Sequence, residues 1–173
     1  NYTYFKDYYH ADQASTLFNL LRVSAEKEFN VGKRWHWQTE ITLQQKTGAA
    51  PVNVPLIYTR NLFYFKGNLG FKNLMLLFGT EAKYHTPYKA DGYSPMLGQF
   101  VYQDSATISL KAPHIAAFLH FRIRTFTAYV RAENLNTVSF KEEFGFTNNN
   151  FASNNYPYPG MQLKIGIFWG FVN

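Results

Sequence analysis

Histidine and acidic side chains are the residues of this sequence whose chemistry could serve catalysis or metal binding. The five histidines are His10, His36, His85, His114 and His120. They show no HExxH or other zinc-binding spacing. His114 and His120 would share one face of a strand, but six extended residues separate them by roughly 20 Å. Glu142 and Glu143 follow Lys141 in a predicted loop, where we expect a solvated charge cluster rather than acid–base catalysis.

Other signatures of enzymes do not occur in the sequence. Cysteine is absent, which excludes thiolate nucleophiles and Cys-ligated zinc. GxSxG, P-loop and GxGxxG motifs do not occur either. We therefore predict that the protein is not an enzyme, with no catalytic residue, metal site or cofactor.

Charged side chains of both signs alternate with apolar residues over much of the chain. This spacing would gather the charges on one face of a sheet. There they could line a path for ions, or they could pair with one another and fill the space. The residues expected on that face are Arg22, Glu26, Glu40, Arg60, Glu81, Lys83, Arg122, Arg131, Glu133 and Lys164. The formal net charge is +6. Because the basic residues are dispersed along the sequence and no nucleic-acid-binding motif occurs, we expect no nucleic-acid partner.

The elements that position these charges are predicted to be long strands. Between Met161 and Phe171, Met, Leu, Ile, Trp and Phe occupy every second position, a period of two over 11 residues. Similar alternation recurs along the chain. It predicts eight strands, at residues 2–10, 15–29, 34–45, 56–66, 73–85, 114–123, 125–135 and 161–171.

Composition and strand length together favour a membrane protein built from strands. The 173 residues suit one domain or part of one, with 19% aromatic and only 16% charged residues. Many aromatics and few charges exclude disorder, and no stretch near 18 apolar residues predicts a membrane helix. Soluble sandwiches use strands of about five or six residues, whereas tilted strands of about 9–11 residues cross a bilayer. We therefore predict an all-β fold, a transmembrane antiparallel β-barrel; a secreted soluble β-sandwich that binds glycans is the competing interpretation.

In a barrel, the charged face should line the lumen and the apolar face should contact lipid. A Lys or Arg on the lipid face costs about 2–4 kcal/mol at the bilayer midplane. Aromatics that collect near strand ends, such as Trp35 and Trp37, match interfacial girdles. The expected location is the bacterial outer membrane, with outer-membrane lipid as a partner.

The connections fall into a short and a long class, which should alternate between the two sides of the membrane. This alternation holds if residues 86–113 form one long loop in which 99–107 is not a crossing strand but, at most, a short hairpin. The long loops are rich in Tyr, Asn, Pro and Gly, a composition usual for turns. Alternatively, these loops bind glycans or fold inward to constrict a pore.

Several blocks of the sequence resemble a known family. The segments 55–61, 79–88 and 93–100 resemble the Bacteroidetes family of putative porins, and 129–135 and 156–171 resemble the last two strands of outer-membrane barrels of that phylum. The resemblance implies an outer-membrane β-barrel with passive transport. It also implies that the chain is the C-terminal portion of a larger barrel, as does the absence of a signal sequence; a complete eight-stranded barrel is the alternative.

The last predicted strand ends in aromatics. This ending resembles the signal that the barrel-assembly machinery recognises, and Trp169 and Phe171 would carry it, although Val172 and Asn173 follow. Alternatively, the two rings are only girdle anchors.

The function predicted from the sequence is porin-like passive transport of small solutes. Eight strands leave an interior that side chains fill, so only a larger barrel would conduct. The alternative is a structural or accessory barrel that acts through contacts with other outer-membrane proteins.

Overall fold

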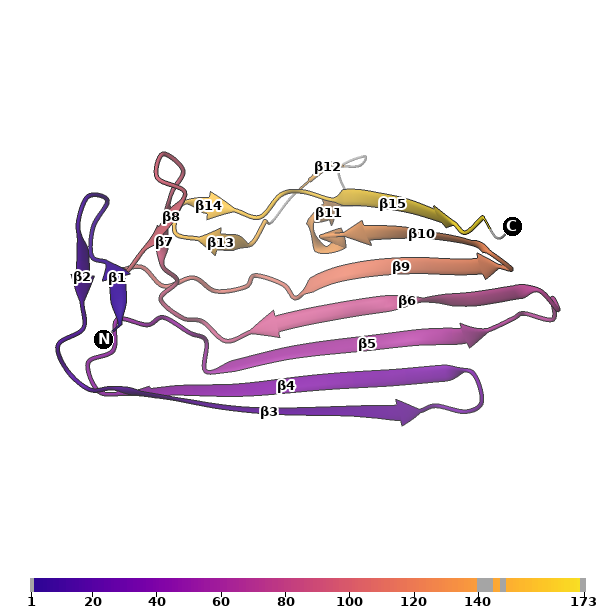
Figure 1. Cartoon of the computed structure of the whole chain (residues 1–173), viewed down its shortest axis with the longest axis horizontal. Helices are drawn as coiled ribbons and strands as arrows, with labels where there is room; N and C mark the ends of the chain where they lie inside the picture. Colours follow the sequence, from indigo (N-terminus) through magenta and orange to yellow (C-terminus); the bar gives the residue numbers. More distant parts are fainter. Residues whose placement is uncertain (1, 140–144, 147–148, 172–173) are drawn as a thin grey trace.

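A computed structural model describes residues 2–139, 145–146 and 149–171. The predicted charge cluster at Lys141, Glu142 and Glu143 lies outside these residues, as do Val172 and Asn173. The dominant element is a seven-stranded sheet in the order β15-β10-β9-β6-β5-β4-β3, with every neighbouring pair antiparallel (Figure 1). Its strands are β3 (Asn19–Asn30), β4 (Trp35–Thr47), β5 (Ile57–Gly67), β6 (Leu74–His85), β9 (His114–Ile123), β10 (Phe126–Glu133) and β15 (Gln162–Trp169).

Seven of the eight predicted strands correspond to strands of this sheet, and the prediction at residues 2–10 is wrong. That segment contributes β1 (Thr3–Phe5), which forms a small hairpin with β2 (Ala11–Gln13). Asp7 provides the physical reason, because its Oδ1 accepts hydrogen bonds from the backbone N–H groups of Tyr9 and His10, each at 2.8 Å. An aspartate that bonds the backbone two and three residues onward favours a turn, which ends the strand.

Three short hairpins gather at the end of the sheet where the long connections lie (Figure 1). They are β1 with β2, β7 (Gly92–Ser94) with β8 (Gln99–Val101), and β13 (Phe151–Ser153) with β14 (Tyr156–Pro157). β8 does not join the large sheet, so the prediction of a short hairpin in the loop of residues 86–113 is confirmed. The loop of residues 134–161 also contains η1 (Leu135–Thr137), β11 (Val138–Ser139) and β12 (Gly145–Phe146).

The opposite end of the sheet carries the short connections. Residues 31–34, 68–73 and 124–125 join β3 to β4, β5 to β6, and β9 to β10. We call the two ends of the sheet the long-loop end and the short-turn end.

The sheet is open, and the closed barrel predicted from the sequence is not seen in the described residues. β3 pairs only with β4 there, and β15 only with β10. Because the wrong prediction at residues 2–10 removes one strand, seven remain, and antiparallel pairing makes the two edge strands run in the same direction. A direct β3–β15 pair would be parallel, whereas bacterial single-chain barrels close with an even number of antiparallel strands.

The described part of the chain contains no helix with the length and apolarity needed to cross a membrane. The sheet is a single layer, and its edge strands β3 and β15 are almost entirely exposed. Burial concentrates in the central strands and among the long loops, where Ala50 and Ala90 are buried.

Candidate functional site: the charged face of the sheet

The register of the seven strands places most charged side chains on one face of the sheet; Lys27, opposite Thr39, is an exception and lies on the other face. Residues directly opposite each other in a ladder share a face. One such row runs from Glu26 through Glu40, Arg60 and Lys83 to His114. All ten charged residues selected from the sequence fall on this face, which we call the polar face. They are Arg22, Glu26, Glu40, Arg60, Glu81, Lys83, Arg122, Arg131, Glu133 and Lys164.

The other face, the apolar face, is exposed. Leu163, Ile165, Ile167 and Trp169 alternate along β15 on this face and are all exposed. Soluble monomers rarely expose apolar surface over more than a few hundred Å². An exposed apolar face of this kind is typical of surfaces that meet lipid or another protein.

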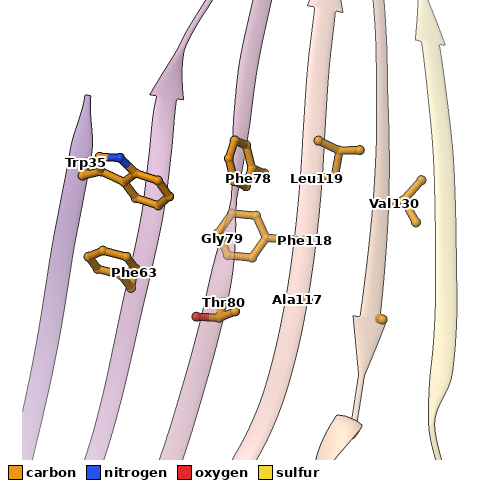
Figure 2. Close-up of a pocket in the computed structure, with 10 residues that line it drawn as sticks. Trp35, Phe63, Phe78, Gly79, Thr80, Ala117, Phe118, Leu119 and Val130 are labelled. Carbon is orange, nitrogen blue, oxygen red and sulfur yellow. The ribbon is translucent and has the colours of Figure 1, made fainter. Parts of the chain in front are cut away.

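The centre of the sheet also carries an apolar depression of about 600 Å³ (Figure 2). Rings of Trp35, Phe63 and Phe78 stand on one side of it, and Val130 lies on the other. Trp35 stacks on Phe63 with ring centroids 5.1 Å apart. The lining includes small residues, among them Gly79 and Ala117, so the surface is hollowed between the rings.

Glu81 is the centre of an ion-pair network on the polar face. Its side chain is only 1% exposed. Arg60 Nε donates to Glu81 Oε1 at 2.5 Å, and Arg131 Nη2 donates to Glu81 Oε2. Lys83 Nζ lies 3.5 Å from Oε1. Because an unpaired buried carboxylate is strongly unfavourable, these three cations are what allows Glu81 to be buried.

The network continues to the edge strand through Glu133. Arg131 Nε donates to Glu133 Oε1 at 2.9 Å, and Lys164 Nζ donates to Oε2 at 2.5 Å. The paired charges thus extend over β5, β6, β10 and β15, across β9. Six of the ten predicted residues meet in this network.

The other four predicted residues lie apart from it. Glu26 accepts a hydrogen bond from Gln38 Nε2 on β4. Glu40 stands between Glu26 and Arg60 in the register. Arg22 lies near the long-loop end of β3, and Arg122 lies at the short-turn end of β9.

A cavity of about 280 Å³ adjoins the network, and the loop of residues 134–161 contributes to its wall. Glu81, Arg131 and Glu133 line it together with His114 and Tyr158. The rings of His114 and Tyr158 lie 4.3 Å apart, centroid to centroid. The part played by His114 and Tyr158 was not predicted from the sequence, where the Tyr/Asn/Pro-rich loop was the only signal.

Asn150 fastens this loop to the start of β9. The side chain is buried; its Oδ1 accepts from the backbone N–H of Lys111 at 2.9 Å, and its Nδ2 donates to the carbonyl of Ala112 at 2.9 Å. The N–H of Tyr158 donates to the Asn150 carbonyl at 2.8 Å. Burial raises the pKa of the Tyr158 phenol. The loop is therefore held against the end of the sheet by paired polar groups.

A second buried cluster ties the remaining long loops together. Asn53 Nδ2 donates to Asp91 Oδ1 at 2.7 Å and to the carbonyl of Gln103 at 2.6 Å. Ser153 Oγ donates to the carbonyl of Asp91 at 2.5 Å. Burial raises the pKa of Asp91, and the Asn53 amide and the charge of Lys46 offset part of that rise. Three loops far apart in sequence therefore form one connected layer.

The aromatic pair selected at the end of the chain lies at the short-turn end. Trp169 is the last residue of β15 and stacks on Phe171, with ring centroids 5.3 Å apart. Phe126 packs edge-on against Trp169 at 6.0 Å. Both Trp169 and Phe171 are exposed.

The described residues contain no group of three or more His, Asp or Glu side chains arranged to hold a metal ion. The fold and its surface define an all-β protein whose large antiparallel sheet has one charged and one apolar face. The family model described as "Putative porin" matches residues 1–173, and the chain belongs to that family. Comparison with curated proteins and with solved structures finds no match.

Proposed function

We propose that the chain forms part of the wall of an outer-membrane β-barrel that passes small solutes by porin-like passive transport. The observation that carries the proposal is the segregation of charge: all ten selected residues occupy the polar face, opposite an exposed apolar face. In a barrel the polar face lines the lumen and the apolar face meets lipid. Membership of the family agrees with this arrangement.

Strand length supports the same proposal. Five strands of the large sheet, β3, β4, β5, β6 and β9, have 10–13 residues, and about 9–11 residues cross the bilayer when tilted. By the usual asymmetry of bacterial barrels, the short turns face the periplasm and the long loops face the exterior.

The open edges support a larger barrel. β3 and β15 need further strands as partners, and seven strands alone would enclose an interior that side chains fill. We place the chain, by its resemblance to Bacteroidetes sequences, in the C-terminal portion of such a barrel. Trp169 and Phe171 would then serve as the assembly signal for the barrel-assembly machinery or as girdle anchors.

Single-channel recording in planar bilayers tests the transport proposal. The full-length protein should give conductance steps, and Glu40→Lys on the polar face should shift the reversal potential in a salt gradient toward anion selectivity. Ile41→Val, the adjacent residue on the apolar face, should leave that potential unchanged. Protein that inserts but gives no steps would overturn the proposal.

A second candidate, an accessory barrel that works through protein contacts, is favoured by the surface of the long loops. A cleft of about 550 Å³ is lined by residues that include Tyr9, Tyr93, Met96 and Tyr156. Met96 is 94% and Tyr9 88% exposed. Exposed aromatic and Met side chains are typical of interaction surfaces.

Affinity purification after mild detergent extraction tests this second candidate. A stoichiometric partner should copurify with the full-length protein and be lost when Tyr9→Ser and Met96→Ser are combined. Leu56→Ser, an exposed loop substitution outside the cleft, is the matched control. Absence of any copurifying protein would remove the candidate.

A further inference from the structure

The net charge of the chain is concentrated at the short-turn end. The sequence has 17 Lys and Arg against 11 Asp and Glu. Six of the cations occupy the three short turns or the strand ends beside them: Lys33, Arg34, Lys66, Lys72, Arg122 and Arg124. The remaining 11 Lys and Arg residues equal the 11 Asp and Glu residues in number. The excess of +6 thus resides at one end of the sheet, although these cations are dispersed in sequence.

No acidic residue accompanies these cations in the neighbouring sequence. The segments 29–39, 64–80 and 118–132 contain neither Asp nor Glu. Among the residues that the structure describes, none of the six forms an ion pair. Glu81 differs from these six cations, because three oppositely charged side chains in the same sheet surround it.

Five of the six cations line one pocket of about 540 Å³. They are Arg34, Lys66, Lys72, Arg122 and Arg124. Asn68 and Asn73 add amide groups to its wall. The pocket therefore presents donors from all three short turns and from the ends of β5 and β9.

Hydrogen bonds hold the backbone segments that carry these side chains. The N–H of Lys66 donates to the carbonyl of Arg34 at 2.8 Å. Arg122 Nε donates to the carbonyl of Arg124 at 3.1 Å, which joins the last residues of β9 to the turn that follows. Arg124 has φ 52°, a left-handed conformation that Gly or Asn adopts at lower cost. Arg124 therefore lines the pocket although its backbone conformation is strained.

The register places the cluster on the polar face. Lys66 stands opposite Leu77 in the ladder that continues to His120, and Arg122 stands opposite Met75 and Thr127. These positions share the face that carries Glu81. The cluster is thus at the rim of the surface that the proposed function assigns to the lumen.

We infer that this pocket binds the phosphoryl group of a dissolved anionic solute at the periplasmic mouth of the barrel. Planar guanidinium groups donate paired hydrogen bonds to a phosphate, and ammonium groups add charge. Five neighbouring cations without acids repel one another, so a divalent oxyanion relieves that repulsion. The inference rests on the proposed function for the placement of the pocket in the lumen, but binding itself requires only the five cations.

Phosphorus-31 NMR of inorganic phosphate, titrated with the full-length protein in an uncharged, phosphate-free detergent, tests the inference. Wild-type protein should broaden the phosphate resonance at low ionic strength, and added salt should weaken the effect. Arg122→Gln combined with Arg124→Gln should weaken binding about tenfold or more, as expected for the loss of two charge-assisted contacts. If that variant fails to fold, Lys72→Gln combined with Arg124→Gly also removes two charges from the turns and should likewise weaken phosphate binding.

The matched control removes the same charge from the opposite end. Lys89→Gln with Lys111→Gln alters two exposed loop lysines and should leave phosphate binding within about twofold of wild type. Equal affinity in all variants, or no binding to wild type, would overturn the inference.

Two further comparisons are needed. One distinguishes a dissolved anion from a lipid headgroup, and the other distinguishes failure of the phosphate site from failure of the proposed channel. A site that takes short-chain phosphatidic acid but not inorganic phosphate would overturn the assignment to dissolved solutes. Phosphate binding without conductance steps would retain the site and reject the channel. Conductance steps without phosphate binding would retain the channel and reject the phosphate site.

Discussion

The two ends of the sheet accommodate polar groups in different ways. At the long-loop end, most buried amides and charges are paired: Asn150 bonds the backbone of the segment that leads into β9, and Asn53 joins Asp91 to Gln103. Two buried amide atoms in the described loops, Asn136 Nδ2 and Asn149 Oδ1, are exceptions. At the short-turn end, the connections have two to six residues, and none of the six cations in them or beside them forms an ion pair within the described residues. Long loops supply enough chain to satisfy most of their buried polar groups internally, whereas the short turns leave their charges available to a ligand.

The Glu81 network lies between these ends and marks the boundary. Glu28, Glu81 and Glu133 are the last acids before the short-turn end on their strands. Toward the long loops, charge is balanced within the protein; beyond this boundary it is not. The paired region should therefore be sensitive to the loss of a partner, and the unpaired region should not.

The largest effect is expected from Glu81→Gln. Neutralising Glu81 weakens two charge-assisted hydrogen bonds, from the partly exposed Arg60 and Arg131, and such bonds contribute about 1.5–3 kcal/mol each. Arg122→Gln at the short-turn end should change stability by less than about 0.5 kcal/mol. The free energy of unfolding, from urea titration of the full-length protein in detergent, distinguishes them; equal losses would refute the proposed difference between paired and unpaired regions.

Asn150→Ala should have the next largest effect and should act on the loops. It removes two hydrogen bonds and leaves the Lys111 N–H and the Ala112 carbonyl without that partner, a cost of about 2–4 kcal/mol. Hydrogen exchange should accelerate in residues 149–159 and 108–114. Asn154→Ala, in the same loop but only partly buried, is the control. Unchanged exchange in Asn150→Ala would mean that the amide does not fasten the loop.

Arg124→Gly should stabilise the protein by about 1 kcal/mol, because glycine adopts φ 52° without the Cβ clash. The same variant should weaken phosphate binding, so stability and ligand affinity would move in opposite directions. Thermal unfolding and the phosphate titration measure the two quantities. Thr125→Gly, whose φ is not positive, should gain no stability. A parallel loss of both quantities in Arg124→Gly would contradict the interpretation of the strained turn.

The smallest expected effect is the pH dependence of the Asp91 cluster. Burial raises the pKa of Asp91 above its ordinary 3.8, so the folded loops bind this proton more tightly than the unfolded chain does. Protonated Asp91 therefore stabilises the folded loops fully at pH values below its ordinary pKa, and this stabilisation is lost as the pH rises through the raised pKa. Limited proteolysis of the loops should therefore be slower at pH 4 than at pH 7. Asp91→Asn keeps an acceptor for Asn53 and should abolish the difference; persistence of the difference would assign it to other groups.

Much of the sheet could be predicted from the sequence because its signal is local. Period-two alternation placed seven strands to within a few residues, and the same alternation put Glu26, Arg60 and Glu81 on a common face. The strand predicted at residues 2–10 failed because the Asp7 turn interrupts an aromatic-rich segment whose composition otherwise favours a strand.

The contacts between distant segments could not be predicted in this way. Tyr158 approaches His114 and Asn150 reaches the start of β9 across loops whose sequence shows only turn composition. The basic pocket escaped detection for the same reason, because Arg34, Lys72 and Arg124 are far apart until the three hairpins bring their turns together. The closed barrel predicted from the sequence would need partners for β3 and β15 that the described residues do not supply.

Single-cysteine labelling along β4 tests most directly whether the polar face meets water and the apolar face meets lipid. The chain contains no cysteine, and any cysteine elsewhere in the full-length protein is first replaced by serine, so that each substitution reports alone. In the full-length protein reconstituted in vesicles, we expect a water-soluble maleimide to label cysteines at positions 36, 38 and 40 and to spare those at 37, 39 and 41. Equal labelling at both sets, or labelling of the second set alone, would contradict the account.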